Sequence, residues 1–497
     1  MVAAEPMNMD TLPTSESTQS ETTWRSQPRK AKDPVLIDDA HPFDLDAYIS
    51  AYSGRSAVQR LMAIANTCPS LAQPALARAV KLLHESREPQ LYLNTIGLHN
   101  SLPGVSSADQ ITADQKWVDD VQSQNASERN KLEVELKTYT SNMIKESIRM
   151  AHRDLGDHYR LTADHANALK HYTKSREFCT TSQHVLEMCL SILELLVEQQ
   201  NYTHITTYIF KAEAALEAVP PASSSGNAQG ASAAVLRRKR RIQAKLDFCN
   251  ALAHMGMTQY EKAAQIFLRL GYKGLDDWYG KLVSPGDIAV YGVLCALASL
   301  PRSSIVSRLG LTQPGTGKGA STTSEPPPFA YFLEQEQYVR ELVDAYVASK
   351  FKTVLEILDR MSARHSLDII LSPHIQELTQ NIRDRAIVLY FQPFASIRLD
   401  RMALAFGLPA DDLEKLVVKL IQAGKIKGRV DSQNKILRAK EQDQRTQMFA
   451  RAEEVGRSIQ SSNRKLLLRI RLMQNELQIA KPKEGKGSMG VLSPIDA

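Results

Sequence analysis

The sequence has no apolar run long enough to cross a lipid bilayer. The longest run, IAVYGVLCALASL at residues 288–300, has thirteen residues, whereas a transmembrane helix needs about 20. The first ten residues, MVAAEPMNMD, have neither the basic nor the apolar part of a signal peptide. We therefore expect a soluble, intracellular protein in which residues 288–300 form a buried helix.

Cysteine is also scarce, and its spacing excludes the common metal and redox motifs. The chain has five cysteines and no Cys-x-x-Cys pair: Cys68, Cys179, Cys189, Cys249 and Cys295. An odd, scattered set in a chain without a secretion signal is typical of reduced, buried thiols. We therefore expect no disulfide framework.

This chain lacks the strong positive charge that many nucleic-acid-binding proteins carry over their surface. The net charge is +6, and one run of basic residues accounts for five of these charges. The run, RRKRR, consists of Arg237, Arg238, Lys239, Arg240 and Arg241. It is either a candidate nuclear-import signal or anion-binding patch, or a solvated helix start beside a loop.

No motif for catalysis or cofactor binding is present. GTGKGAST at residues 315–322 lacks both the first Gly of a phosphate-binding loop and the Ser or Thr after its Lys. HESRE at residues 84–88 ends in Glu where a zinc-protease helix has His. Four histidines are spaced six, seven and six residues apart, which favours surface imidazoles over a metal site: His152, His158, His165 and His171. We expect no cofactor and no enzymatic activity.

Helical periodicity, in contrast, extends over most of the chain. After a polar tail at residues 1–34, which we expect to be disordered, helices are predicted within 43–65, at 73–86 and as one long helix at 113–153. Further helices are predicted at 242–270, 287–300, 331–360 and 373–390. No alternating strand pattern precedes residue 425, so the body is predicted to be all-α.

Part of this body resembles tetratricopeptide repeats. LGDHY at residues 155–159 matches the core of the first repeat helix, and Ala168 and Tyr172 follow where the second helix needs a small residue and then an aromatic one. Ala263 and Phe267 repeat this pair. The pattern predicts a superhelical stack of TPR-like helix pairs. Low-complexity segments at 220–234 and 313–328 predict two loop inserts.

Near residue 396 the sequence pattern changes from helices alone to two helices followed by short strands. A helix is predicted at 396–408 and a second at 410–424, followed by two short strands on either side of the turn DSQN at 431–434. An apolar stripe on the second helix predicts the core of this unit: Leu413, Leu416, Val417 and Leu420. Two helices followed by a β-hairpin predict a winged helix over residues 396–440.

Winged helices bind either DNA or other proteins. The exposed face of the second helix carries Asp411, Asp412 and Glu414 and no arginine, which disfavours base readout. We therefore predict that the wing is a lateral contact with another subunit. Its residues are Lys425, Ile426, Lys427, Arg429, Val430, Lys435, Ile436 and Leu437.

Residues 441–480 are predicted to form a long helix whose apolar stripe has no obvious partner within the chain. The stripe consists of Met448, Ala452, Val455, Ile459, Leu466, Ile470, Met473 and Leu477. Such a stripe at the end of a chain is typical of a helix that enters a bundle with helices from other subunits. A polar tail at 481–497 follows.

Helical repeats followed by a winged helix are the layout of the PCI-domain family. Within it, several segments resemble the subunit-one branch of the COP-nine (constitutive photomorphogenesis) signalosome. They are YISAYSGRSAVQRLMAIANTCP at 48–69, SPGDIAVYGVLCALASL at 284–300, the PCI region at 371–406 and RVDSQNKILRAKEQDQR at 429–445. The resemblance covers roughly residues 40–480 and lapses in the two inserts.

The patterns along the chain, together with the resemblance, predict a domain division. It consists of a tail at 1–34, an N-terminal helical region at 35–150, repeats at 151–300, the helical part of the PCI domain at 301–395, the winged helix at 396–440, a bundle helix at 441–480 and a tail at 481–497.

The resemblance also implies a function. The expected protein is a non-catalytic scaffold of a complex that removes a ubiquitin-like modifier from cullins and so regulates cullin–RING ubiquitin ligases. Its expected partners are other signalosome subunits, with subunits two and three as neighbours, and cullin–RING ligases through the complex. The expected location is nucleus and cytoplasm, with no membrane and no specific nucleic acid as partner.

Two alternatives remain open. The first is a PCI subunit of the proteasome lid or of a translation initiation factor complex, which would have the same fold but enter a different assembly. The second is a winged-helix regulator that binds nucleic acid through the basic wing.

Overall fold

A computed structural model describes residues 35, 37, 38, 41–103, 109–218, 229–309, 327–440 and 444–475. Both predicted tails, the GTGKGAST segment and most of the two predicted inserts lie outside these residues. The chain divides into two compact units. Unit 1 consists of Met1–Pro393 and Met402–Pro409, and unit 2 of Phe394–Arg401 and Ala410–Ala497. The finer division at residues 150 and 300 remains a prediction.

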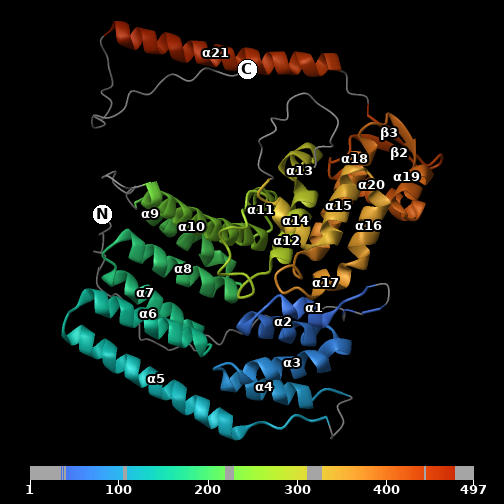
Figure 1. Cartoon of the computed structure of the whole chain (residues 1–497). Coiled ribbons are helices and arrows are strands. Elements are labelled where there is room, and N and C mark those ends of the chain that lie inside the picture. The colour runs from blue at the N-terminus through green and yellow to red at the C-terminus, as the bar shows by residue number, and fades with distance from the viewer. Residues whose placement is uncertain are drawn as a thin grey trace, which may run out of the picture. The chain divides into compact units, whose positions relative to one another are not determined.

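Unit 1 is helical. Its first nine α-helices are α1 (Leu45–Ser50), α2 (Gly54–Thr67), α3 (Ala72–His84), α4 (Pro89–Asn100), α5 (Gln115–Ser141), α6 (Lys145–Leu161), α7 (His165–Ser175), α8 (Ser182–Glu198) and α9 (Tyr202–Glu217). The others are α10 (Gln229–Gly256), α11 (Tyr260–Phe267), α12 (Pro285–Ser299), α13 (Arg302–Leu309), α14 (Ala330–Gln335), α15 (Gln337–Val347), α16 (Phe351–Arg360), α17 (Ser362–Leu367) and α18 (Ile375–Phe391). Successive helices pack side by side, as the pairs α6–α7, α8–α9 and α10–α11 illustrate (Figure 1). The prediction of stacked helix pairs is confirmed.

The small-then-aromatic pattern has a direct structural explanation in α6 and α7. Ala168 and Tyr172 are both buried, and the Tyr172 ring occupies the space that a Cβ atom on Gly156 would need, with ring carbons 2.5 and 2.7 Å from that position. Ala263 and Phe267 are likewise buried at the second occurrence. A glycine on one helix therefore makes room for an aromatic ring on the next.

Several predicted element boundaries were wrong. The helix predicted at 113–153 is two helices, because the chain turns at Met143, which has a φ of 53°. The helix predicted at 331–360 is three helices, α14, α15 and α16. The insert predicted at 220–234 ends early, because α10 already begins at Gln229.

Unit 2 contains a three-stranded antiparallel sheet in the order β1-β3-β2. The strands are β1 (Ser396–Arg398), β2 (Gly428–Asp431) and β3 (Ile436–Ala439). The helices are α20 (Ala410–Gln422), α21 (Gln444–Gln474) and the start of α19 (Leu399–Phe406), which continues into unit 1. The helix predicted to begin at residue 396 therefore begins three residues later, since residues 396–398 pair with β3. The fold class is otherwise confirmed.

Within the described part of the chain, no helix combines the length and apolar character that a membrane span requires.

Candidate functional site

A buried polar cluster of unit 1 is centred on Arg60 of α2. Its guanidinium group donates to Asp368 Oδ2 at 2.7 Å through Nη1 and to Asp287 Oδ2 at 3.0 Å through Nη2. Nη1 also donates to the hydroxyl of Tyr48 at 2.6 Å, and the guanidinium carbon lies 4.0 Å from the centre of the Tyr52 ring. We call these residues, together with Tyr291, the Arg60 network.

The two carboxylates are themselves fixed by the backbone. Asp287 is in the first turn of α12, where its amide donates to Ser284 Oγ and its Oδ2 accepts from the Ser284 amide. Asp368 Oδ1 accepts from the amides of Ile370 and Leu371, each at 2.8 Å. Because local hydrogen bonds hold both acceptors in place, Arg60 meets a preorganised site.

The pKa values of the two carboxyl groups shift in opposite directions. Burial raises the pKa of Asp287, and the nearby Arg60 charge only partly offsets this. The pKa of Asp368 is lowered: burial alone would raise it, but the Arg60 charge and hydrogen bonds from the Leu371 amide, Arg60 and Tyr291 outweigh burial. Asp368 is therefore the principal counterion of Arg60, whose side chain is 3% exposed.

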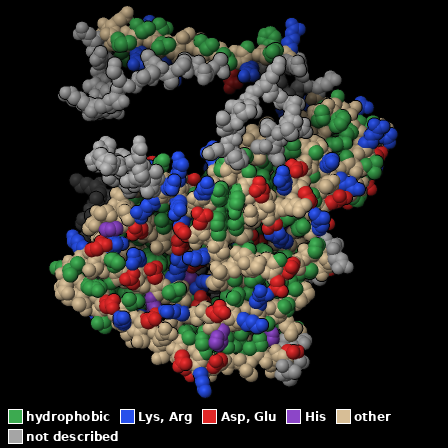
Figure 2. All heavy atoms as spheres, viewed as in Figure 1, with side chains coloured by type: hydrophobic (Ala, Val, Ile, Leu, Met, Phe, Trp, Pro, Cys, Tyr) green, Lys and Arg blue, Asp and Glu red, His purple; other side chains and the backbone are tan. Residues whose placement is uncertain are grey.

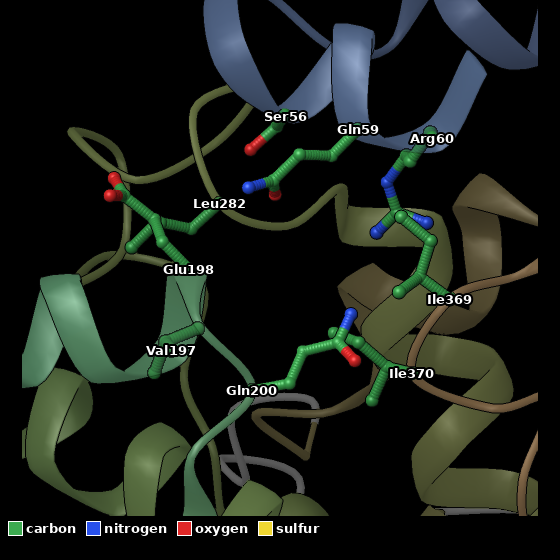
Figure 3. Close-up of a pocket in the computed structure, with 9 residues that line it drawn as sticks. All are labelled: Ser56, Gln59, Arg60, Val197, Glu198, Gln200, Leu282, Ile369 and Ile370. Carbon is green, nitrogen blue, oxygen red and sulfur yellow. The ribbon is translucent and has the colours of Figure 1, made fainter. Parts of the chain in front are cut away.

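The space around the Arg60 network is too small for a substrate. A cavity of about 30 Å³ lies beside Arg60, where Gln59 and Gln200 approach it from α2 and from the turn after α8 (Figure 3). This volume suits a water molecule or two. Among the described residues, no group of three or more His, Cys, Asp or Glu side chains could hold a metal ion. The hydrogen bonds of the network join α2 to α12 and to the segment that follows α17.

Sequence reasoning missed this network, although it identified the segments that form it. Tyr48, Tyr52 and Arg60 belong to the segment at 48–69, and Asp287 and Tyr291 belong to the segment at 284–300. The hydrogen bonds between Arg60 and Asp287 and between Tyr52 and Asp287 join the two segments directly. The signal was a charged residue inside each apolar helix pattern, at positions where a surface residue is not expected.

The four residues predicted for the winged-helix core lie on α20 in unit 2. Leu413, Val417 and Leu420 of α20 are buried, and Leu416 is half-buried. Two residues predicted for the lateral contact, Ile426 and Leu437, are also buried within the chain, so their side chains contribute to this core rather than to a surface.

The other predicted wing residues lie nearer the surface. Lys425, Lys427 and Arg429 are exposed, whereas Val430, Lys435 and Ile436 are half-buried. Lys435 Nζ pairs with Asp411 Oδ1 at 3.1 Å and so ties the turn of the wing to α20. β3 is the central strand, so β1 and β2 each have an outer edge without a strand partner in the described residues.

The apolar stripe predicted for the C-terminal helix lies on α21 and is exposed. Exposed fractions are 75% for Met448, 50% for Val455, 56% for Ile459 and 55% for Leu466, and hydrophobic side chains are visible along the helix (Figure 2). Ala452, Ile470 and Met473 are exposed as well, while Leu477 lies outside the described residues. The prediction that this stripe enters a bundle stays a prediction.

All five residues of the RRKRR run are exposed on α10. Arg238 pairs with Glu187 at 3.4 Å. Any role of the run in nuclear import stays a prediction.

Two of the four histidines are more buried than predicted. His152 and His158 are buried, so the prediction of surface imidazoles was wrong for both. His152 and His171 face each other, with their Nδ1 atoms 3.1 Å apart.

All five cysteines are free thiols, four buried and Cys179 half-buried.

Models of two known families match this chain. Residues 114–308 match the model described as 26S proteasome subunit RPN7, and residues 352–441 match the PCI domain. The second match includes all three strands and α20, and the first covers the helix pairs from α5 to α12.

Individual relatives cover most of the chain. COP9 signalosome complex subunit 1b of Drosophila melanogaster is 31% identical over 98% of this chain and 94% of its own length. COP9 signalosome complex subunit 1 of Arabidopsis thaliana is 33% identical over 88% of this chain and 92% of its own. The 26S proteasome non-ATPase regulatory subunit 6 of Caenorhabditis elegans is 21% identical over 65% of this chain.

Proposed function

Because this chain belongs to the family of COP9 signalosome subunit 1, we propose that it is a non-catalytic scaffold subunit of that complex. By this proposal the complex removes a ubiquitin-like modifier from cullins and thereby regulates cullin–RING ligases, and the zinc isopeptidase activity resides in another subunit. The chain contributes by holding other subunits in place.

The observation that carries this proposal is the exposed α21. Nine of its large apolar side chains are exposed: Met448, Phe449, Val455, Ile459, Leu466, Leu467, Leu468, Ile470 and Met473. A helix of 31 residues with this pattern gains little stability alone and is stabilised when other helices cover its apolar side chains. The open edges of β1 and β2 support a second contact, by which neighbouring winged helices, expected from subunits two and three, align edge to edge.

We further propose that the protein acts in both nucleus and cytoplasm. The exposed RRKRR run on α10 supports access by an import receptor. Replacing Arg237, Lys239 and Arg241 by Gln in a fluorescently tagged full chain should lower the nuclear fraction. An unchanged nuclear fraction would assign the run another role.

An affinity pull-down of the tagged protein from its own cells, followed by mass spectrometry, tests the proposed scaffold function. Recovery of a stoichiometric set of PCI subunits, a zinc isopeptidase subunit and cullins is the expected result. Recovery of proteasome ATPases or of ribosomal subunits would instead favour the proteasome lid or an initiation factor complex. Salt-dependent nucleic-acid binding that falls when Lys425, Lys427 and Arg429 are neutralised would favour the nucleic-acid-binding alternative.

A further inference from the structure

The apolar stripe of α21 is narrow and runs along the whole helix. At about 100° per residue, its members fall within one sector about 60° wide. They are Met448, Ala452, Val455, Ile459, Leu466, Ile470 and Met473. One neighbouring helix is enough to cover a stripe of this width, as in the seam of a coiled coil.

On the face opposite the stripe, large apolar side chains occur in the C-terminal half of α21, residues 461–474. Leu468 lies on this face and Leu467 lies beside the stripe, and they are 60% and 58% exposed. Ala450 precedes Leu468 by about five turns and so occupies the same face in the N-terminal half, where Glu454 and Arg457 follow it. The C-terminal half therefore exposes apolar side chains in several directions, which one neighbouring helix cannot cover.

The C-terminal half is also positively charged. It has no acidic residue and four exposed basic ones: Arg464, Lys465, Arg469 and Arg471. In the N-terminal half, by contrast, Arg457 pairs with Glu453. Basic side chains beside an apolar contact lose part of their hydration when a partner covers it, and acidic residues on that partner offset the loss.

We propose that the C-terminal half of α21 is enclosed by two or more helices of other subunits, which carry acidic residues beside their apolar faces, and that the N-terminal half lies against a single helix. The acidic residues would pair with the basic side chains at the margin of the apolar contact, as charged residues flank the core of a coiled coil. This inference deepens the proposed scaffold function and rests on it.

The test is a pull-down of the tagged full chain from its own cells, with the other subunits measured by mass spectrometry. Leu468→Asp and Ala450→Asp place the same side chain on the same face, about five turns apart. Leu468→Asp buries a charge if the C-terminal half is enclosed, so recovery of the other subunits should fall about tenfold or more. Ala450→Asp leaves the charge in water and should match the parent. Equal recovery by the two variants would overturn the proposal.

A third variant separates this proposal from the scaffold function. Replacement of Val455, Ile459 and Leu466 by Ser removes the stripe common to both halves, so recovery should fall here too. If this variant matches the parent, α21 is not an assembly contact, and the observation that carries the scaffold function fails with the inference. If this variant loses recovery and Leu468→Asp does not, the scaffold function stands and the enclosure of the C-terminal half is wrong.

Salt dependence tests the acidic character of the partner helices. With Arg469 and Arg471 replaced by Gln, recovery at low salt should be about fivefold below that of the parent, and the difference should shrink as salt screens the ion pairs. Replacing Arg451 and Arg457 by Gln is the control and should match the parent at each salt concentration. Equal recovery by the parent and the Arg469 and Arg471 variant at low salt would contradict acidic partners.

An anionic lipid surface is the other occupant that a basic, apolar helix could have. It predicts that the full chain cosediments with vesicles of phosphatidylcholine and phosphatidylserine, and that Leu468→Asp abolishes this. That result, together with unchanged recovery of the other subunits by Leu468→Asp, would overturn the proposal. We expect no cosedimentation.

Discussion

Arg60 carries more of the stability of unit 1 than any exposed charge, because its removal leaves two carboxylates without a counterion. In Arg60→Met the apolar stem is kept, but Asp287 and Asp368 remain buried and unpaired. Breaking such a pair on one side typically costs about 3–5 kcal/mol. We expect a large fall in the unfolding midpoint of the full chain in urea, measured by circular dichroism.

The matched control is Arg78→Met, which removes an arginine from an exposed ion pair with Asp46. Exposed pairs contribute about 0–1 kcal/mol, so this variant should unfold close to the parent. Equal destabilisation by the two substitutions would show that burial of Arg60 is energetically unimportant.

His365 should make the stability of the protein pH-dependent. Its side chain is buried beside Tyr338, with its Nε2 3.2 Å from the tyrosine hydroxyl, and burial, helped by the Arg364 charge, lowers its pKa to about 4. Between pH 6.5 and pH 4 the unfolded chain binds a proton here and the folded chain does not, so stability is lost as the pH falls. This one group contributes a loss of about 2 kcal/mol between pH 6.5 and pH 5.

The contribution can be isolated with His365→Gln, because other histidines, such as the half-buried His171, also have a lowered pKa and lose stability in the same direction. The variant should lose less stability than the parent between pH 6.5 and pH 5, in thermal unfolding followed by circular dichroism. His204→Gln, at an exposed position, controls for the loss of an imidazole elsewhere. Parallel pH profiles for the parent and the His365 variant would contradict the argument.

Long-range contacts between single side chains could not be predicted from the sequence. The segments that contain Arg60 and Asp287 could be predicted as helices, because their apolar residues recur at helical spacing. Their pairing could not be predicted, since 227 positions separate them and periodicity carries no information on long-range contacts.

Among the helices, the α6–α7 pair offers a sharp test of packing. Gly156→Ala places a methyl group 2.5 Å from a ring carbon of Tyr172, so the two helices must separate or the ring must leave its groove. Overpacking of this kind typically costs about 1–3 kcal/mol. We expect the thermal unfolding midpoint of the full chain to fall.

Gly97→Ala is the matched control, since nothing lies within 4 Å of the added methyl group in α4. Alanine is the better helix former by about 1 kcal/mol, so this variant should be slightly more stable than the parent. If both substitutions shift the midpoint in the same direction, the close packing of Tyr172 on Gly156 is not the cause.

The elements whose positions were predicted wrongly have no local signal in the sequence. β1 has three residues and is held by pairing with β3, with Ile397 opposite Leu437; a strand this short has no periodicity of its own. The turn between α5 and α6 places Met143 at a positive φ, without the glycine or proline that usually marks such a turn. By contrast, Leu413, Val417 and Leu420 follow the helical repeat strictly and are buried.

By the proposed scaffold function, assembly of the complex depends on α21, whose large apolar side chains are almost all exposed. Truncation after residue 440 removes α21 and leaves intact the three strands and the apolar face of α20 that form the core of unit 2. The truncated chain should therefore keep the thermal unfolding midpoint of the parent. Its recovery of the other subunits in a pull-down should fall strongly, because the bundle contact is lost.

The two readouts separate an assembly role from a structural one. A truncated chain that unfolds at a lower temperature would show that α21 packs on its own chain. A truncated chain that recovers the other subunits as well as the parent does would leave the edges of β1 and β2 as the principal assembly contact.

A substitution variant with Val455, Ile459 and Leu466 replaced by Ser tests the same stripe without changing the length of the chain. Since these side chains are each at least half exposed, the substitutions remove little internal packing, and a loss of assembly would be attributable to the stripe itself.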